Sequence, residues 1–160
     1  RIGEYKIGFK LVRGAYMEKE ANRALEFGYD NPIQNSKKDT DEDYDEAIRL
    51  CFESRDVVSF CAGTHNEKSS LLLAQLIDES DVAVNDDRFW FAQLYGMSDN
   101  ISYNLAAAGY NVAKYLPYGP IKEVLPYLSR RAQENSSVKG QASRELNLIQ
   151  QEIKRRKLAK

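Results

Sequence analysis

The sequence predicts an α/β fold built on a parallel sheet. Four short apolar segments recur along its 160 residues, and each is followed by a segment with helical periodicity. Strict alternation of strand and helix is typical of either a (βα) barrel or a doubly wound sheet. The charge is nearly balanced, with 23 Lys and Arg against 24 Asp and Glu, which argues against a general nucleic-acid binder. No apolar run approaches the ~20 residues that span a bilayer.

The first strand and helix are predicted over residues 6–13 and 15–27. Alternate positions of the strand are apolar, which is the two-residue period of a strand with one buried face. Gly28 is a suitable helix stop, because glycine readily adopts the left-handed conformation that ends helices. The polar residues 29–41 then indicate a loop, and we expect Asp41 to cap the next helix.

The second helix and strand are predicted over residues 42–54 and 57–62. Apolar residues of the helix recur from Tyr44 at i+3, i+4, i+7 and i+8, which places them on one face. The strand is apolar at every position except Ser59, as expected where a parallel sheet buries both faces. Residues 63–66 form a turn, and a helix over residues 67–79 follows it.

The remaining elements continue the alternation. They are strands over residues 88–94 and 111–116 and helices over residues 99–108, 120–135 and 143–158. The Ser, Gly and Lys residues of 136–142 indicate a linker, and Ser143 is the expected cap of the last helix. We therefore expect residues 1–135 to form four βα units, the number in half of a (βα)8 barrel, and residues 136–160 to form a linker and a terminal helix.

Ligands of parallel α/β folds bind at the carboxyl ends of the strands. The residues expected there are rich in hydrogen-bond donors and aromatic rings, but they include no carboxylate pair suited to glycoside hydrolysis and no serine placed as a nucleophile. Neither GxGxxG nor a phosphate-binding P-loop follows a strand. The sequence has two cysteines and one histidine, which are too few for a structural zinc site or a disulfide scaffold. We therefore expect no metal.

The helix over residues 120–135 carries a distinctive polar stripe. Tyr127, Arg130, Arg131 and Glu134 recur at helical spacing, and an arginine pair can hold a carboxylate or phosphate in a bidentate manner. The alternative is a solvated face of i,i+4 salt bridges. Lys10 also has two interpretations, because a lysine in an apolar strand either faces a ligand or reaches solvent at the strand end.

Five segments resemble the proline dehydrogenase family. They are KLVRGAY (10–16), GTHN (63–66), FAQLYGM (91–97), KYLPYG (114–119) and YLSRRAQEN (127–135). The resemblance implies a distorted (βα)8 barrel, of which this chain supplies about the last four βα units. It also implies that FAD binds at the carboxyl ends of the strands and that L-proline is oxidised to Δ1-pyrroline-5-carboxylate, with the electrons passed to a membrane quinone.

The same resemblance assigns roles to the candidate residues. The residues that would contact FAD are Lys10, Arg13, Gly14, Ala15, Thr64, His65, Asn66 and Gln93. Lys10 would also act in catalysis, because a cation beside the flavin stabilises negative charge on its reduced form. Gln93 is expected to face the barrel mouth.

The expected substrate residues are Leu11, Tyr115, Tyr127, Arg130, Arg131 and Glu134. By resemblance, the two arginines grip the carboxylate of proline and Glu134 positions one of them. The tyrosines form walls around the ring, with Leu11 as a third. Tyr115 favours proline over hydroxyproline, because a smaller residue is expected there in the related hydroxyproline dehydrogenases.

The expected partners are L-proline, a quinone acceptor and the surface of a membrane, with no nucleic acid. The expected location is the bacterial cytoplasm next to the inner membrane, or the mitochondrion of a eukaryote. Two other functions remain as alternatives: a non-redox barrel enzyme that binds a phosphorylated substrate, and a half-barrel that serves only in assembly. No Met precedes Met17, so we expect that residue 1 is not the natural start. The resemblance implies an amino-terminal half that would supply a further substrate-site lysine and aspartate.

Overall fold

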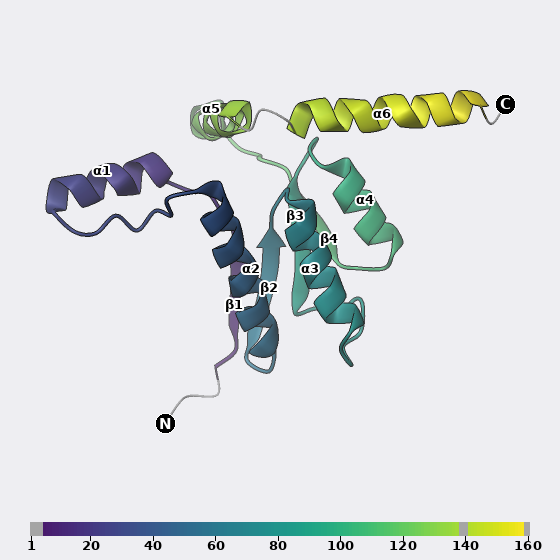
Figure 1. The fold of residues 1–160 in the computed structure, drawn as a ribbon, viewed down its shortest axis with the longest axis horizontal. Coiled ribbons are helices and arrows are strands. Elements are labelled where there is room, and N and C mark those ends of the chain that lie inside the picture. Colours follow the sequence, from purple (N-terminus) through teal and green to yellow (C-terminus); the bar gives the residue numbers. More distant parts are fainter. Residues whose placement is uncertain (1–4, 138–140, 159–160) are drawn as a thin grey trace. The chain divides into compact units, whose positions relative to one another are not determined.

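A computed structural model describes residues 5–137 and 141–158, and strands and helices alternate along them (Figure 1). The strands are β1 (Ile7–Leu11), β2 (Val58–Gly63), β3 (Phe89–Leu94) and β4 (Val112–Tyr115). The helices are α1 (Met17–Phe27), α2 (Lys37–Glu53), α3 (Glu67–Asp78), α4 (Asp99–Ala107), α5 (Ile121–Ser137) and α6 (Gln141–Leu158). The chain divides into two compact units, one up to Lys114 and one from Tyr115 onward.

The four strands form one sheet in the order β1-β2-β3-β4. β2 pairs in parallel with both β1 and β3, and its Cys61 lies opposite Lys10 on one side and Trp90 on the other. A doubly wound sheet reverses its strand order at a switch point, whereas these strands keep the order of the sequence. The α/β prediction is therefore confirmed, and the strand order matches successive units of a barrel.

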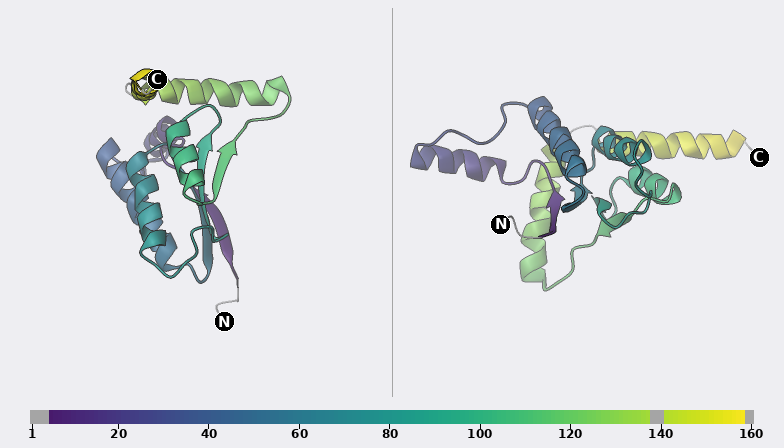
Figure 2. Two further views of the ribbon diagram at one scale, coloured as in Figure 1. Left: turned by 90° about the vertical axis from the view of Figure 1, so that its right-hand side faces the viewer. Right: turned by 90° about the horizontal axis from the view of Figure 1, so that it is seen from below.

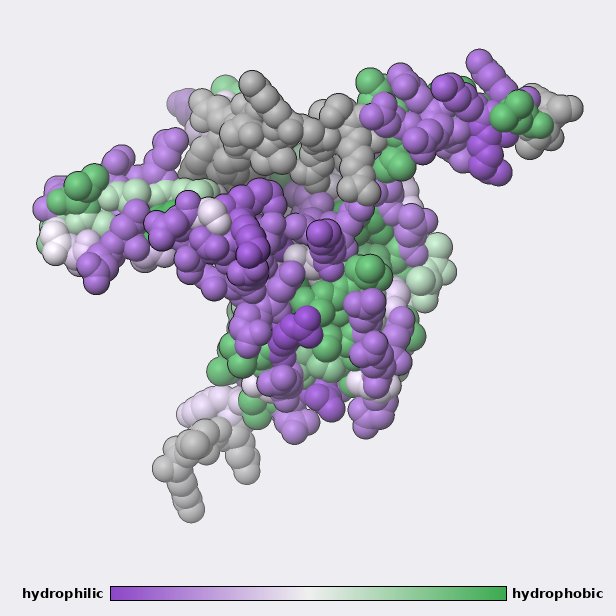
Figure 3. All heavy atoms as spheres, in the orientation of Figure 1, coloured by the Kyte–Doolittle hydropathy of each residue, from purple (hydrophilic) through white to green (hydrophobic). Residues whose placement is uncertain are grey.

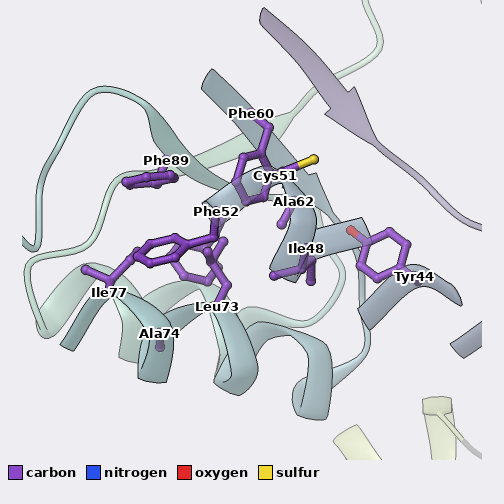
Figure 4. Close-up of a cluster of buried hydrophobic side chains, with 11 residues drawn as sticks. Tyr44, Ile48, Cys51, Phe52, Phe60, Ala62, Leu73, Ala74, Ile77 and Phe89 are labelled. Atoms are coloured by element: carbon purple, nitrogen blue, oxygen red, sulfur yellow. The ribbon is translucent and has the colours of Figure 1, made fainter. Parts of the chain in front are cut away.

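The core of the first unit lies between the sheet and the helices that cover one of its faces (Figure 2). Phe60 and Ala62 of β2 and Phe89 and Phe91 of β3 point into this layer, and all four are at most 2% exposed. Helices α2 and α3 contribute the facing side chains, which are Tyr44, Ile48, Cys51, Phe52, Leu73, Ala74 and Ile77 (Figure 4). The helical periodicity from Tyr44 therefore identified the buried face of α2 correctly.

The boundaries of α2 differ from those predicted. The helix begins at Lys37, four residues before Asp41, because Ser36 has extended backbone angles and its hydroxyl accepts a hydrogen bond from the Asp39 amide at 3.1 Å. Asp41 is thus not the cap, and residues 37–41 are not loop. The polar residues of this first turn were interpreted as loop, although polar residues are also typical of the solvent-exposed start of a helix.

β1 is more exposed than the sequence pattern suggested. Ile7 and Phe9 are 54% and 40% exposed, because β1 is an edge strand of the described sheet and α2 packs mainly beside Leu11 and β2. The end of α1 agrees with the prediction: Gly28 adopts a left-handed φ of 69° and its amide donates to the Ala24 carbonyl.

The second unit contains the two helices predicted for it. Residues 136 and 137 belong to α5, residues 141 and 142 belong to α6, and the middle of the predicted linker, 138–140, lies outside the described residues. α6 begins at Gln141, so Ser143 lies inside the helix and is not its cap. α6 is largely hydrophilic with separate hydrophobic residues (Figure 3). Within the described ranges, every helix is too short or too polar to cross a bilayer.

Candidate functional site

The chain turns sharply at the carboxyl end of β1. Gly14 and Tyr16 adopt left-handed φ values of 70° and 57° and lead directly into α1. Glycine accepts this conformation readily, whereas a tyrosine in it carries steric strain. Such strained residues concentrate where the backbone is shaped for binding. Ala15 lies between them and is half-buried.

Arg13 is held by a cluster of acidic and polar side chains on the helix side of this turn. Its guanidinium pairs with Asp41, donates to the Ser69 hydroxyl at 2.5 Å and lies 4.0 Å from the Asp45 carboxylate. The same group stacks on the Tyr44 ring at 3.9 Å. Arg13 therefore ties the end of β1 to α2 and α3, and it reaches the predicted cofactor turn as part of an ion-pair cluster.

This cluster also changes the acidity of Asp41. Partial burial acts to raise the pKa of its carboxyl group, but the hydrogen bond from Lys37 and the charges of Arg13 and Lys37 outweigh burial. The net result is a pKa below the ordinary value of 3.8. Asp41 thus remains ionised opposite Arg13 at neutral pH.

Lys10 lies on the face of the sheet opposite the core. Its strand neighbour Leu11 packs against the buried cluster, so the alternation of a strand directs Lys10 to the other side. A side chain at Gly63 would meet the Lys10 Cε at 2.6 Å, which shows that the lysine lies across the bare backbone of β2. Burial raises the pKa of the paired Cys61 thiol, and the Lys10 charge opposes this shift.

The turn after β2 is built from Thr64, His65 and Asn66. Thr64 is 4% exposed, and its hydroxyl accepts from the Asn66 amide at 3.1 Å. The Asn66 side chain caps α3 by accepting from the Lys68 and Ser69 amides at 2.9 and 3.3 Å. The turn thus delivers the amino end of α3 to the carboxyl edge of the sheet, where helix amides and the helix dipole favour an anion.

Gln93 does not face the barrel mouth as expected. It follows Phe89 and Phe91 on the helix-covered face and is 2% exposed. Its Nε2 donates to the Thr64 carbonyl at 3.2 Å, and its Oε1 accepts from the Ser102 hydroxyl of α4 at 2.8 Å. The alternation of β3 directs the Gln93 side chain to the helix-covered face, where its amide binds Thr64 and Ser102 and not the barrel mouth.

His65 contacts the start of α4. Its Nδ1 lies 2.8 Å from the Ser98 hydroxyl oxygen, and Ser98 is a 2% exposed residue with a left-handed φ of 51°. Ser98 and Ser102 were not among the predicted site residues, and neither were Asp41 and Asp45 as partners of Arg13. Their only sequence signal was proximity to a predicted helix start, which does not reveal these long-range contacts.

In the second unit, two of the predicted substrate residues meet. The rings of Tyr115 and Tyr127 pack edge to face with centroids 5.9 Å apart. Arg130, Arg131 and Glu134 follow on α5, but their side chains lie outside the described part of the chain. Leu11, the expected third wall, belongs to the first unit and packs against its core.

The donor set at the strand ends suits an anionic, partly aromatic ligand. Lys10 supplies positive charge, whereas the charge of Arg13 is paired with Asp41. Thr64 and His65 supply polar atoms, and the amino end of α3 adds the dipole of a helix. The chemistry of these donors fits a dinucleotide with a diphosphate, such as FAD. A phosphorylated substrate would use the same charges, so the donor set alone leaves both ligands open.

The chain is similar to known proteins along most of its length. A family model described as proline dehydrogenase matches residues 1–144. The chain is 43% identical to proline dehydrogenase 1, mitochondrial, of Caenorhabditis elegans, over 95% of this chain and 26% of that protein. It is 40% identical to hydroxyproline dehydrogenase of Xenopus laevis, over 93% of this chain and 33% of that protein. The chain thus spans about a quarter to a third of the length of these curated relatives.

Two solved structures of proline utilization A share the fold. The protein from Bdellovibrio bacteriovorus, inactivated by N-propargylglycine, aligns with a TM-score of 0.73 and 25% identity, over 82% of this chain and 14% of that one. A variant of the Bradyrhizobium japonicum protein aligns with a TM-score of 0.67 and 30% identity, over 81% of this chain and 13% of that one. The fold is therefore that of successive βα units of a TIM-type barrel, as expected.

Proposed function

This chain belongs to the proline dehydrogenase family, and from that premise we propose that it contributes the carboxyl-terminal half of a barrel that oxidises L-proline with FAD. The observation that carries the proposal is the family match over residues 1–144, which spans both the cofactor turns and the substrate helix. A phosphate-binding barrel and a non-catalytic module have no comparable support.

Lys10 and the turns after β1 and β2 would hold FAD. The cationic end of Lys10 lies across Gly63 on the face opposite the core, which suits a contact with a planar anionic ring. Thr64, His65 and the start of α3 suit the diphosphate. When bound, the flavin would supply the acceptor for a hydride, which carries two electrons, and protein side chains do not provide such an acceptor.

The residues of the second unit would hold the substrate. Arg130 and Arg131 are proposed to bind the carboxylate, with Glu134 positioning a guanidinium. The edge-to-face Tyr115 and Tyr127 rings offer an apolar wall of the size of a pyrrolidine ring. This arrangement works by positioning, because it fixes the carbon that loses hydrogen. A protonated amine resists hydride loss, so the rate should rise with pH.

The test of the substrate site is Arg131→Met in the complete enzyme. Loss of a bidentate, charge-assisted contact should raise the KM for proline about a hundredfold while the FAD content stays near that of the unaltered protein. Steady-state kinetics with a dye acceptor and the flavin absorbance measure the two effects. Arg155→Met on the exposed end of α6 is the control. An unchanged KM in Arg131→Met would refute the proposed clamp.

Tyr115 tests the choice between proline and hydroxyproline. Tyr115→Ser should shift the ratio of kcat/KM values toward hydroxyproline, about tenfold, because removal of the ring makes room for a hydroxyl group. Tyr118→Ser, at a 96% exposed tyrosine of the same unit, is the matched control. If Tyr115→Ser leaves the ratio unchanged, Tyr115 does not form the wall.

The acceptor and the location are also part of the proposal. We infer a quinone as the electron acceptor and a peripheral contact with the membrane that holds it. Relatives from animals and plants are named mitochondrial, which supports a mitochondrial location for a eukaryotic source. Reduction of a short-chain quinone by proline in the presence of the complete enzyme would test the acceptor directly.

A further inference from the structure

A circuit of polar contacts surrounds the turn after β2. The Thr64 carbonyl accepts from Gln93, and Gln93 accepts from the Ser102 hydroxyl. The single proton of the Ser102 hydroxyl is shared with the Ser98 carbonyl at 3.2 Å, and the Ser98 hydroxyl contacts His65 Nδ1, one residue from Thr64. Each residue of this circuit except His65 is at most 4% exposed. Burial excludes competing water, so the geometry of the circuit is tightly defined.

Ser98 is the strained member of the circuit. It is one of two non-glycine residues with positive φ in the described part of the chain, and it precedes α4 without capping that helix through its side chain. Its hydroxyl is instead directed to the imidazole of His65. Ser98 thus combines an unfavourable backbone conformation and a missing helix cap with a contact to a histidine 33 positions away. Strain of this kind concentrates at functional sites, which points to a functional role for the contact with His65.

We propose that Ser98 is a positioning residue that fixes the His65 ring for cofactor binding, with Gln93 and Ser102 holding the turn that carries His65. This inference rests on the proposed function, because it assumes that His65 contacts FAD. Nδ1 is directed toward α4 by Ser98, which sets the plane of the ring and the direction in which Nε2 is presented. The turn is anchored at Thr64 at the same time, so neither the backbone nor the ring can rotate independently.

Two substitutions of Ser98 separate positioning from stability. Ser98→Gly removes the hydroxyl but relieves the left-handed strain, whereas Ser98→Ala removes the hydroxyl and keeps the strain. We expect Ser98→Ala to unfold at a lower urea concentration than Ser98→Gly. Both should nevertheless weaken FAD binding by the same factor, about fivefold, because both lose the same contact with His65.

The control is Ser80→Ala. Ser80 is half-buried and its hydroxyl donates to the Ile77 carbonyl at 2.8 Å, but it follows the carboxyl end of α3, away from the turn after β2. FAD binding is measured in the complete enzyme by titrating the apoprotein and following flavin fluorescence. Ser80→Ala should leave the dissociation constant unchanged.

A double-mutant cycle tests whether Ser98 acts through His65. In a His65→Gln background, Ser98→Gly should cause no further loss of FAD affinity. Nitrogen NMR of 15N-labelled histidine gives a readout without cofactor: the Nδ1 signal of His65 should shift in Ser98→Gly and stay unchanged in Ser80→Ala. An unchanged dissociation constant in Ser98→Gly, or full additivity with His65→Gln, would overturn the inference.

The FAD affinities of His65→Gln and Ser98→Gly separate a failure of the positioning role from a failure of the proposed function. If His65→Gln weakens FAD binding and Ser98→Gly does not, His65 contacts the cofactor without help from Ser98, and only the positioning role fails. If the complete enzyme binds no FAD, the cofactor assignment fails. If His65→Gln binds FAD normally, only the contact between His65 and FAD fails. The positioning role fails in both cases.

Discussion

The turns after β1 and β2 are fixed by different forces. Arg13 fixes the first through charge, by pairing with Asp41 and Asp45 at the surface of α2. The second is fixed by neutral hydrogen bonds through Gln93 and Ser102, which are almost completely buried. Ion pairs near water are screened by salt and lost in acid, whereas buried neutral hydrogen bonds respond to neither. Two neighbouring parts of one proposed cofactor site should therefore respond differently to solution conditions.

The largest effect should come from the buried side. Gln93→Leu leaves the Thr64 carbonyl without its side-chain donor and limits the Ser102 hydroxyl to the Ser98 carbonyl, which should lower the free energy of unfolding by about 2–3 kcal/mol. Urea unfolding measures the loss, which should be the same at low and high salt. Gln75→Leu, on the exposed side of α3, is the control and should change stability by less than about 0.5 kcal/mol. Equal effects of the two variants would contradict a structural role for the Gln93 amide.

A smaller effect should come from the charged side, and it should depend on salt. Arg13→Leu leaves Asp41 and Asp45 without their cation and should cost about 1–2 kcal/mol at low ionic strength. The loss should shrink in about 1 M salt, where charges are screened beyond about 3 Å. Arg49→Leu, at an exposed position of α2, serves as the control in the same unfolding experiment. A loss that is independent of salt would remove the contrast between the two turns.

The smallest effect should appear in acid. The folded-state pKa of Asp41 lies below 3.8, the value taken for the unfolded chain, so folding favours its ionised form. The contribution of Asp41 to the free energy of unfolding is fully present well above pH 3.8, and it is lost as the pH falls through the lowered folded-state pKa. The free energy of unfolding should therefore begin to decrease below about pH 5. In Asp41→Asn the free energy of unfolding should fall less across this pH range than in the unaltered protein, with a difference of less than about 1 kcal/mol. In the control Ser102→Ala, the free energy of unfolding should depend on pH as it does in the unaltered protein. Identical acid slopes in Asp41→Asn and the unaltered protein would contradict this account.

Periodicity predicted the elements of the fold because it reports which face of a strand or helix is buried. The face of α2 that begins at Tyr44 and the strand pattern of β3 were recoverable in this way. The start of α2 was not, since Ser36 and Asp41 are both good caps in sequence and only the backbone angles distinguish them. The predicted direction of the Gln93 side chain was also wrong, because the alternation of β3 directs it to the helix-covered face.

The site was predictable as a set of segments but not as a set of contacts. Turn residues such as Gly14 and Thr64 follow from the ends of strands, and the family resemblance assigned them a role. The partners that hold them come from distant positions: Asp41 is 28 residues from Arg13, and Ser98 is 33 residues from His65. Pairings of that length depend on how helices pack on the sheet, which local sequence patterns do not contain.

Gly63 has a consequence for how this sequence can change over time. Lys10 lies where a side chain at position 63 would be, at 2.6 Å from the Cε, and the Leu11 carbonyl is only 3.0 Å from the same point. A side chain at position 63 would therefore displace the end of Lys10 and also crowd the backbone of β1. We expect glycine at position 63 to be retained among relatives that carry a long cation at position 10. The cation proposed to face the flavin is thus inherited as a pair of positions on two strands.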